Sequence, residues 1–228
     1  MLSALVVACV AVVVLIFVAN SNTTSASGER TGNLAKAVSP SATAATFPGS
    51  NLGAIPDGAG VTTCGSDGTP RDVTFNVTGI TGAPSNVEVS MTFGSPVHTW
   101  RGDLGAVLIA PNATSFTLYK YIGSTTAAGC GSGNDFAGPY NFKDSAAGTN
   151  IWTVATTPTT AGDYRTTAAG GAGQTNPAPV TNLTAAFAGV SNPNGTWTLR
   201  MTDGGVGDTG AISAATLTIT GSAAAPVQ

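Results

Sequence analysis

The sequence predicts an all-β domain, and three observations carry this prediction. Apolar residues alternate with polar ones in short segments such as Val73, Phe75 and Val77, as expected of strands with one buried face. Gly, Pro and Asn residues separate these segments at short intervals, for example at residues 82–84 and 94–96. Charged residues make up only 8% of the chain, so the strong helix formers Lys and Glu are scarce. Many short strands with regular turns are typical of a β-sandwich or jelly roll.

The strands can be assigned in chain order from this pattern. The alternation predicts strands near residues 73–77, 87–93, 197–201 and 217–219, and the apolar stretch 104–110 predicts a strand buried on both faces. Weaker candidates are residues 116–118, 140–142, 151–154 and 183–187. Residues 156–180 are rich in Gly, Thr and Ala, and we expect a long surface loop there. After the apolar N-terminus, no segment shows a clear helical period.

The chain begins with an apolar leader, residues 1–21. Residues 2–19 are apolar apart from Ser3 and Cys9, which is close to the length of a membrane-spanning helix. Three interpretations stay open: a cleaved signal peptide, a membrane anchor in contact with lipid through residues 2–19, and an assembly helix that resembles that of a type IV pilin-like subunit. The last interpretation lacks one expected feature, because Leu5 stands where such helices often carry an acidic residue.

The remaining chain divides into three parts by composition. Residues 22–50 are rich in Ser, Thr, Ala and Gly, so we expect a flexible spacer, with a short helix near residues 33–38. The β domain is expected at residues 51–221, followed by a short tail at 222–228. The chain has 8 Lys and Arg against 11 Asp and Glu, a formal net charge of −3. A nucleic-acid partner is therefore not expected, because phosphate binding needs clustered cations.

Two longer segments carry a resemblance to a known family. The first reads HTWRGDL at residues 98–104 and continues to IAP at 109–111; the second reads NGTWTL at 194–199, with TD at 202–203, DTG at 208–210 and LTI at 217–219. Weaker marks are IPD at 55–57, YNFKD at 140–144 and AFAG at 186–189. Over residues 51–221 the chain resembles the P domain (Homo B domain) of kexin- and furin-like, subtilisin-related proprotein convertases. Ala214 and Ala215 stand where the family usually has a Trp.

The resemblance implies a fold and a function. The implied fold is a jelly-roll β-sandwich of about eight strands. In the family this domain stabilises and tunes a neighbouring protease, so the implied function is a non-catalytic module that binds or stabilises a protein partner. The motif residues that carry this expectation are His98, Trp100, Arg101, Gly102, Asp103, Trp197, Asp203 and Gly210. The alternative is a self-associating structural subunit of a cell-surface filament, with the β-sandwich as its exposed head.

Catalysis is not expected from these residues. Nucleophilic hydrolysis needs a nucleophile, a base and a group that orients the base. The chain has a single histidine, His98, which lies inside a P-domain motif, and it contains no Gly-x-Ser-x-Gly sequence. We interpret His98 as a hydrogen-bonded structural side chain at the start of a strand.

Arg101, Gly102 and Asp103 spell the tripeptide that integrins recognise. That function needs an exposed loop tip, whereas this tripeptide leads directly into the buried strand at 104–110. The sequence therefore favours a structural role in which Arg101 pairs with a carboxylate and fixes the start of the strand.

Four carboxylates form a candidate calcium site. Asp203 and Asp208 flank a Gly-rich turn, and Asp57 and Asp103 complete the set if the N-terminal strand lies beside the last one. Hard oxygen ligands on a tight turn suit Ca²⁺. In the competing interpretation, these Asp side chains accept hydrogen bonds from backbone amides of the turn. A zinc site is not expected, because one His and scattered Cys do not make a four-ligand set.

Cys64 and Cys130 are the only cysteines after the leader. In an exported all-β chain, two such cysteines most simply form one disulfide. We therefore expect the protein to be exported, and to be extracellular or on the cell surface.

Overall fold

The computed structural model describes residues 42–59, 64–147 and 149–222, and in this part of the chain nearly all regular structure is β. The elements are β1 (Ala44–Ser50), β2 (Gly53–Ile55), β3 (Arg71–Val77), β4 (Pro84–Phe93), β5 (Leu104–Ile109), β6 (Ser115–Lys120), β7 (Tyr140–Phe142), the 3-10 helix η1 (Ile151–Thr153), β8 (Gly162–Tyr164), α1 (Leu183–Ala186), β9 (Gly195–Asp203) and β10 (Gly210–Gly221). The prediction of an all-β domain is confirmed. The described residues form ten strands, more than the eight expected.

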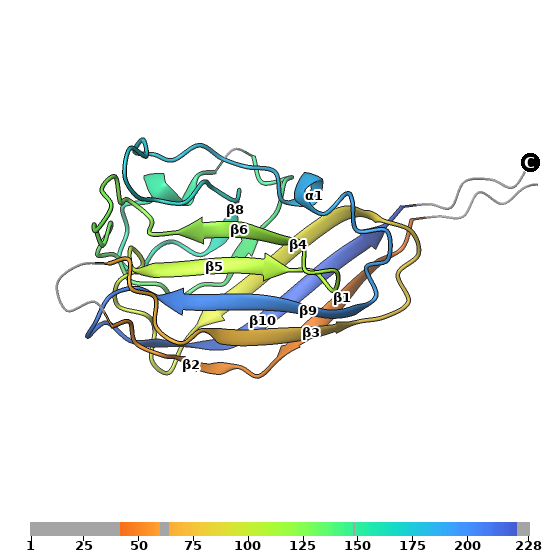
Figure 1. Ribbon diagram of the computed structural model, residues 1–228, viewed down its shortest axis with the longest axis horizontal. Coiled ribbons are helices and arrows are strands. Elements are labelled where there is room, and N and C mark those ends of the chain that lie inside the picture. Colours follow the sequence, from red (N-terminus) through yellow and green to blue (C-terminus); the bar gives the residue numbers. More distant parts are fainter. Residues whose placement is uncertain (1–41, 60–63, 148, 223–228) are drawn as a thin grey trace, which may run out of the picture. The chain divides into compact units, whose positions relative to one another are not determined.

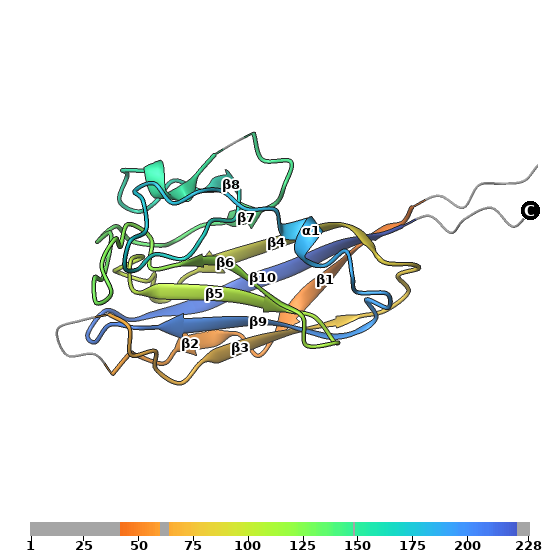
Figure 2. The ribbon, with the colours of Figure 1, turned by 45° about the horizontal axis from the view of Figure 1, so that its top comes forward.

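The strands form one curled, mixed sheet in the order β6-β5-β9-β3-β1-β10-β4-β7-β8, with β2 also paired to β10. Of these pairings, β7 with β8 is parallel and the others are antiparallel. The sheet curls at β1, whose first five residues pair with β10 and whose last two, Gly49 and Ser50, pair with β3. In Figures 1 and 2, β3, β9 and β5 lie across from β10 and β4.

Gly49 lies at the point where β1 changes partners. A Cβ atom on this residue would lie 2.7 Å from Val73 Cγ1 and 3.1 Å from the Ala215 carbonyl oxygen, which is too close for any other side chain. Glycine therefore lets the two halves of the sheet approach at this point.

The hydrophobic core fills the space between the two halves of the curled sheet. Its members alternate along the strands, as Trp197, Leu199 and Met201 of β9 show: all three are fully buried. The buried residues of β4 follow the same alternation. The period-two pattern of the sequence therefore identified the inward faces of these strands correctly.

Four segments differ from the expectations. Residues 44–50, expected in the spacer, form β1. Residues 183–187, expected as a strand, begin α1 instead: Leu183 and Phe187 are four residues apart, which places both on one face of a helical turn, and both are buried. Asp144 accepts hydrogen bonds from the backbone N–H groups of Leu183 (2.8 Å) and Thr184 (2.9 Å) and so caps the helix.

The other two differences lie between β7 and α1. Residues 151–153, expected in a strand, form η1, where the Asn150 side chain accepts a hydrogen bond from Trp152 N. The expected surface loop at 156–180 contains β8, and its Thr167 bridges to Val180. Tyr164, Thr166 and Thr167 are buried, so this segment covers the core rather than leaving it.

The leader, the expected helix at 33–38 and the end of the tail lie outside the described residues. Within the described ranges, no helix is long and apolar enough to cross a membrane.

Candidate functional site

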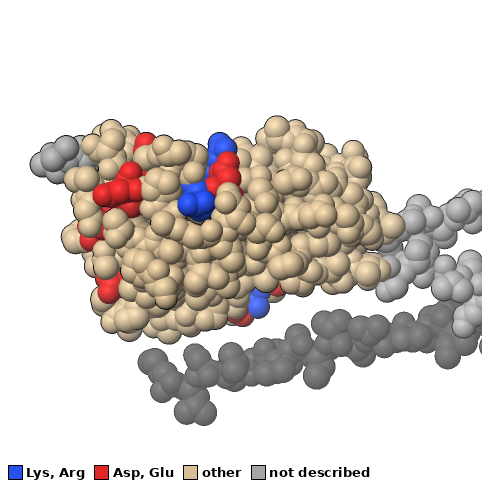
Figure 3. Space-filling view, turned by 90° about the horizontal axis from the view of Figure 1, so that it is seen from below, with Lys and Arg blue, Asp and Glu red and all other residues tan. Residues whose placement is uncertain are grey.

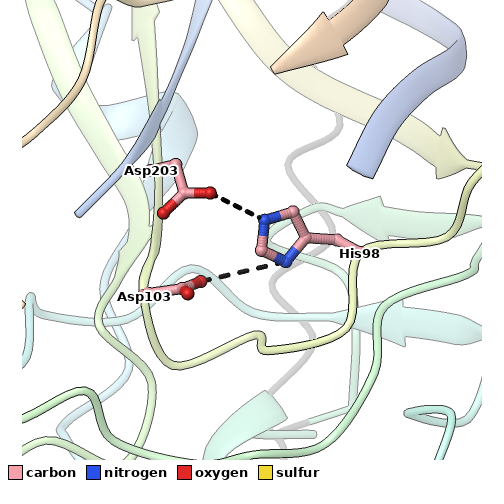
Figure 4. Close-up of side chains that lie close together, drawn as sticks. All are labelled: His98, Asp103 and Asp203. Carbon is pink, nitrogen blue, oxygen red and sulfur yellow. Dashed lines mark hydrogen bonds and ion pairs between the residues drawn. The ribbon is translucent and has the colours of Figure 1, made fainter. Parts of the chain in front are cut away.

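The two motif segments meet at one end of the sheet. β5 and β9 pair so that Leu104 lies opposite Asp203, which brings Asp103, the residue before β5, next to the last residue of β9. His98 is held beside them by backbone hydrogen bonds with Phe136, one in each direction (3.0 and 2.7 Å). The imidazole ring of His98 consequently lies between the carboxylates of Asp103 and Asp203 (Figure 4).

The hydrogen bonds of His98 assign its tautomer. Nδ1 lies 3.3 Å from the backbone N–H of Trp100, which can only donate, so Nδ1 is the acceptor. Nε2 therefore carries the proton and donates to Asp203 Oδ2 at 3.0 Å. Both ring nitrogens have partners and the residue is 0% exposed, so His98 is a buried, hydrogen-bonded side chain.

Asp103 differs from its neighbours, because its Oδ1 is buried without a hydrogen-bond partner. This atom lies 3.8 Å from His98 Nδ1, beyond hydrogen-bonding distance. Burial, followed by the charges of Asp203, Asp208 and Asp57, raises the pKa of Asp103 from 3.8 to about 9. The carboxyl group is thus protonated at neutral pH.

The other three Asp side chains accept hydrogen bonds from the surrounding turns. Asp203 Oδ1 accepts from Gly205 N at 2.9 Å, and both oxygens of Asp57 accept from Gly207 N at 3.1 Å. Asp208 Oδ1 accepts from the hydroxyl of Thr99 at 2.8 Å. The bonds of Asp203 and Asp57 are those of the competing, turn-capping interpretation, whereas the bond of Asp208 comes from the side chain of another segment.

Gly210, the first residue of β10, lies against His98 at this end of the sheet. A Cβ atom on Gly210 would lie 2.6 Å from His98 Cα, so only glycine lets β10 start this close to the histidine. His98 therefore contacts both Asp203, 105 residues later in the chain, and Gly210.

The geometry gives limited support to a metal ion here. One ligand atom each from His98, Asp103 and Asp203 lie within 4.8 Å of one another, but His98 and Asp203 bond each other directly. Ca²⁺ takes 6–8 oxygen ligands, whereas among these three residues the buried oxygen without a hydrogen-bond partner is Asp103 Oδ1, which belongs to a protonated carboxyl group. Figure 3 shows carboxylates gathered at the left end of a face that otherwise carries little charge.

Calcium binding remains a prediction, and thermal melting tests it. If the four carboxylates bind Ca²⁺, the ion relieves their repulsion and stabilises the fold, by about 2.7 kcal/mol at a hundredfold excess over the dissociation constant. The melting temperature should then rise with millimolar Ca²⁺ and fall with chelator, and Asp208→Asn should reduce this response. An unchanged melting temperature, with no heat of binding in calorimetry, would leave the turn-capping interpretation.

The raised pKa of Asp103 predicts a pH dependence of stability in the presence of chelator. Because the folded-state pKa lies above 3.8, this group stabilises the fold fully below pH 3.8, and the contribution is lost as the pH rises toward 9. Asn has nearly the shape of the protonated carboxyl group but takes up no proton when the chain folds, so at pH 8 Asp103→Asn should raise the free energy of unfolding by about 1–3 kcal/mol.

Urea denaturation between pH 5 and 9 measures this effect. Asp163→Asn is the matched control, because Asp163 is half exposed and paired with Lys143. Equal slopes of stability against pH in the wild type and in Asp103→Asn would contradict the prediction.

The expectation that Arg101 pairs with a carboxylate is wrong. Its guanidinium donates to the carbonyl oxygens of Val154 (2.7 Å) and Ile151 (3.4 Å) and to the hydroxyls of Thr159 (3.0 Å) and Ser132 (3.1 Å). These acceptors lie in loops and in η1, where the sequence has no alternation that would have identified them. Arg101, Gly102 and Asp103 are all buried, so the tripeptide is not an exposed loop tip.

Trp100 and Gly102 both contact the segment around residue 130. The Trp100 indole donates to the Cys130 carbonyl oxygen at 2.6 Å, and a Cβ atom on Gly102 would lie 2.1 Å from the same oxygen. Cys130 is bonded to Cys64, as predicted, with a Cα–Cα distance of 4.8 Å. A disulfide is consistent with an oxidising, extracytoplasmic environment.

No family model matches the chain, and no characterised protein or solved structure is significantly similar to it. The functional interpretation therefore depends on the residues described above.

Proposed function

We propose that this chain is a non-catalytic, exported module that binds or stabilises a protein partner, and that it resembles the P domain of kexin-like convertases in this role. By that resemblance, the partner is a subtilisin-like protease. The observation that carries the proposal is the contact between the two motif segments. His98 bonds Asp203 and packs against Gly210, although it lies 105 residues before Asp203 in the chain.

Burial of the polar motif residues supports a non-catalytic role. His98 and Asp203 are 0% exposed, Asp103 is 1% exposed, and both nitrogens of His98 already have hydrogen-bond partners. A general base must come within hydrogen-bonding reach of its substrate, which this enclosed imidazole does not. The hydrogen bonds of the motif residues thus link the chain segments that carry them inside the domain.

The arrangement of the core supports a finer proposal for the fold. The two halves of the curled sheet face each other across one apolar core, with β1 pairing to both. A jelly-roll β-sandwich has two such facing layers. We therefore also propose that the domain is a jelly-roll β-sandwich.

We expect no hydrolase activity from the purified chain. Fluorogenic peptides and casein are suitable substrates for the assay. Turnover that persists through further purification and is lost in His98→Ala, with the fold retained, would contradict the non-catalytic role.

The partner is tested with a kexin-like catalytic domain produced without its own P domain. Adding the full chain in stoichiometric excess should lengthen the half-life of protease activity and give a heavier species in sedimentation velocity. An unrelated β-sandwich of similar mass serves as the control. An unchanged half-life, with both proteins sedimenting separately, would overturn this partner.

A filament subunit is the second candidate, favoured by the sparse charge of the surface. Charged residues make up 8% of the chain, and much of the face in Figure 3 carries none. Low charge reduces the electrostatic repulsion between copies. This function predicts that the native protein keeps Met1 and pellets as long assemblies, whereas a secreted module would start near Asn22 and stay dispersed.

A further inference from the structure

A pocket of about 360 Å³ opens beside Arg101. Its wall includes Ser132 and Asn134 from one loop, residues 152–155 from η1 and the turn after it, and Asn176 from a third segment. None of its lining residues is an Asp or Glu. The volume lies at the lower end of the range for small-ligand sites, which is roughly 300–1,000 Å³.

Arg101 brings a positive charge to this wall without a counter-charge. The residue is 2% exposed, and the acceptors of its guanidinium are two carbonyl and two hydroxyl oxygens, all neutral. It forms an ion pair with no carboxylate of the described residues. The guanidinium has five N–H hydrogens and four acceptors: one bonded to Nε, two to Nη1 and one to Nη2. The second Nη2 hydrogen therefore has no acceptor within the described part of the chain.

The other described cations differ from Arg101 in this respect. Lys120, Lys143, Arg165 and Arg200 each lie within 4.0 Å of an Asp carboxylate. Arg71 has no such partner, but it is only partly buried, so water can solvate its charge. Arg101 therefore combines burial with an unpaired charge, an arrangement that is costly unless an anion completes it.

The chemistry of the pocket selects the kind of anion. The remaining Nη2 hydrogen of Arg101 can donate one charge-assisted hydrogen bond to a carboxylate, and burial strengthens the attraction between the two charges. Burial also lowers the pKa of the Arg101 guanidinium, and a bound anion would oppose that effect. The indole of Trp152, largely buried in the wall, gives the pocket an apolar surface for the carbon atoms next to the charge.

We propose that this pocket binds a carboxylate of a partner polypeptide, with the guanidinium of Arg101 as the anchor and Trp152 as the apolar wall. The proposal rests on the proposed function, because the ligand belongs to the bound protein. Two sources share this chemistry: the C-terminal carboxylate of a chain and the side chain of an Asp or Glu. The pocket has room for a terminal residue or a single acidic side chain.

NMR titration of the isotope-labelled full chain tests the site with small probes. N-acetylglycine represents a terminal carboxylate, and N-acetylglutamic acid α-amide represents a side-chain carboxylate. The neutral controls are N-acetylglycinamide and N-acetylglutamine amide. We expect one of the acids to bind with a dissociation constant of about 1–10 mM, in line with a ligand of so few atoms. The shifts should centre on Ser132, Trp152 and Val154, and the tighter acid identifies the source.

A charge placed in the wall provides the matched variant. Asn176 is exposed and its side chain forms no hydrogen bond within the described residues, so Asn176→Asp should leave the fold unchanged while repelling an anion. We expect it to weaken acid binding at least tenfold. Asn112→Asp is the control: its Oδ1 accepts a hydrogen bond from Thr114 N, which Asp preserves, in the turn at the other end of β5.

Three outcomes separate the possibilities. Acid binding that Asn176→Asp weakens and Asn112→Asp does not supports the pocket. Equal shifts for acids and amides, or acid binding that is insensitive to Asn176→Asp, overturns it. If the chain still stabilises the protease in either overturning case, the proposed function stands without this site; if it binds the acids but not the protease, the partner assignment fails and the site stands.

Discussion

Replacement of Trp197 by alanine should lower the free energy of unfolding by about 3–5 kcal/mol, the usual loss for a large aromatic in a core. Trp197 is 0% exposed and lies on β9 opposite Phe75 of β3. Its ring packs edge-on against Phe187 with centroids 4.9 Å apart, and its Nε1–H donates to the Pro193 carbonyl oxygen at 2.7 Å. The substitution therefore opens a cavity and leaves a buried acceptor without its donor.

Urea denaturation followed by circular dichroism measures this loss. Trp100→Ala is the control, because Trp100 is 36% exposed and should cost less than half as much. A loss below about 1 kcal/mol for Trp197→Ala would mean that the inward face of β9 is assigned wrongly.

Removal of the disulfide should have an effect of similar size. Cys64 and Cys130 are 66 residues apart, so their bond restricts a long loop of the unfolded chain. In the chain-entropy model, the double variant Cys64→Ala, Cys130→Ala should lose about 4 kcal/mol. Guanidinium denaturation of the variant beside the oxidised wild type measures the difference.

Thiol titration of the unfolded wild type is the complementary measurement. The chain contains three cysteines, and with Cys64 and Cys130 bonded only Cys9 should react. Cys9→Ala should then leave no reactive thiol and should not change the stability of the β domain. Three reactive thiols in the wild type would contradict the bond.

Strands with one face in the core could be predicted from the sequence, because their residues obey a period of two. This holds for β3, β4, β9 and β10, whose inward residues are apolar at alternate positions. The pattern fails where few residues contact the core. In β1 only Phe47 is buried, and β8 is three residues long, so neither strand differs from a polar linker in composition. At α1, Leu183 in the helix and Phe187 just after it are too few large apolar residues to show a helical period.

The site was predictable to a similar extent. His98, Asp103 and Asp203 could be selected as polar residues within two unusual motifs, and Cys64 and Cys130 as the pair of cysteines in the domain. The arrangement of His98, Asp103 and Asp203 around one another could not be predicted, because it depends on the register of β5 against β9. The acceptors of Arg101 are carbonyl and hydroxyl oxygens of irregular segments. Because every residue has a backbone carbonyl, the sequence does not indicate which of them accepts a hydrogen bond.

The pairing of β1 with β10 has a consequence for the order in which the domain folds. Ala44 of β1 lies opposite Thr220 of β10, and β10 also pairs with β2 and β4. Three strands from the first half of the domain therefore pair with a strand that is synthesised near the end of the domain. Contacts between such distant segments form slowly, since long loops must close first. A chain emerging from the ribosome therefore keeps these edges unpaired until β10 is synthesised, and it cannot complete this sheet from its N-terminal half.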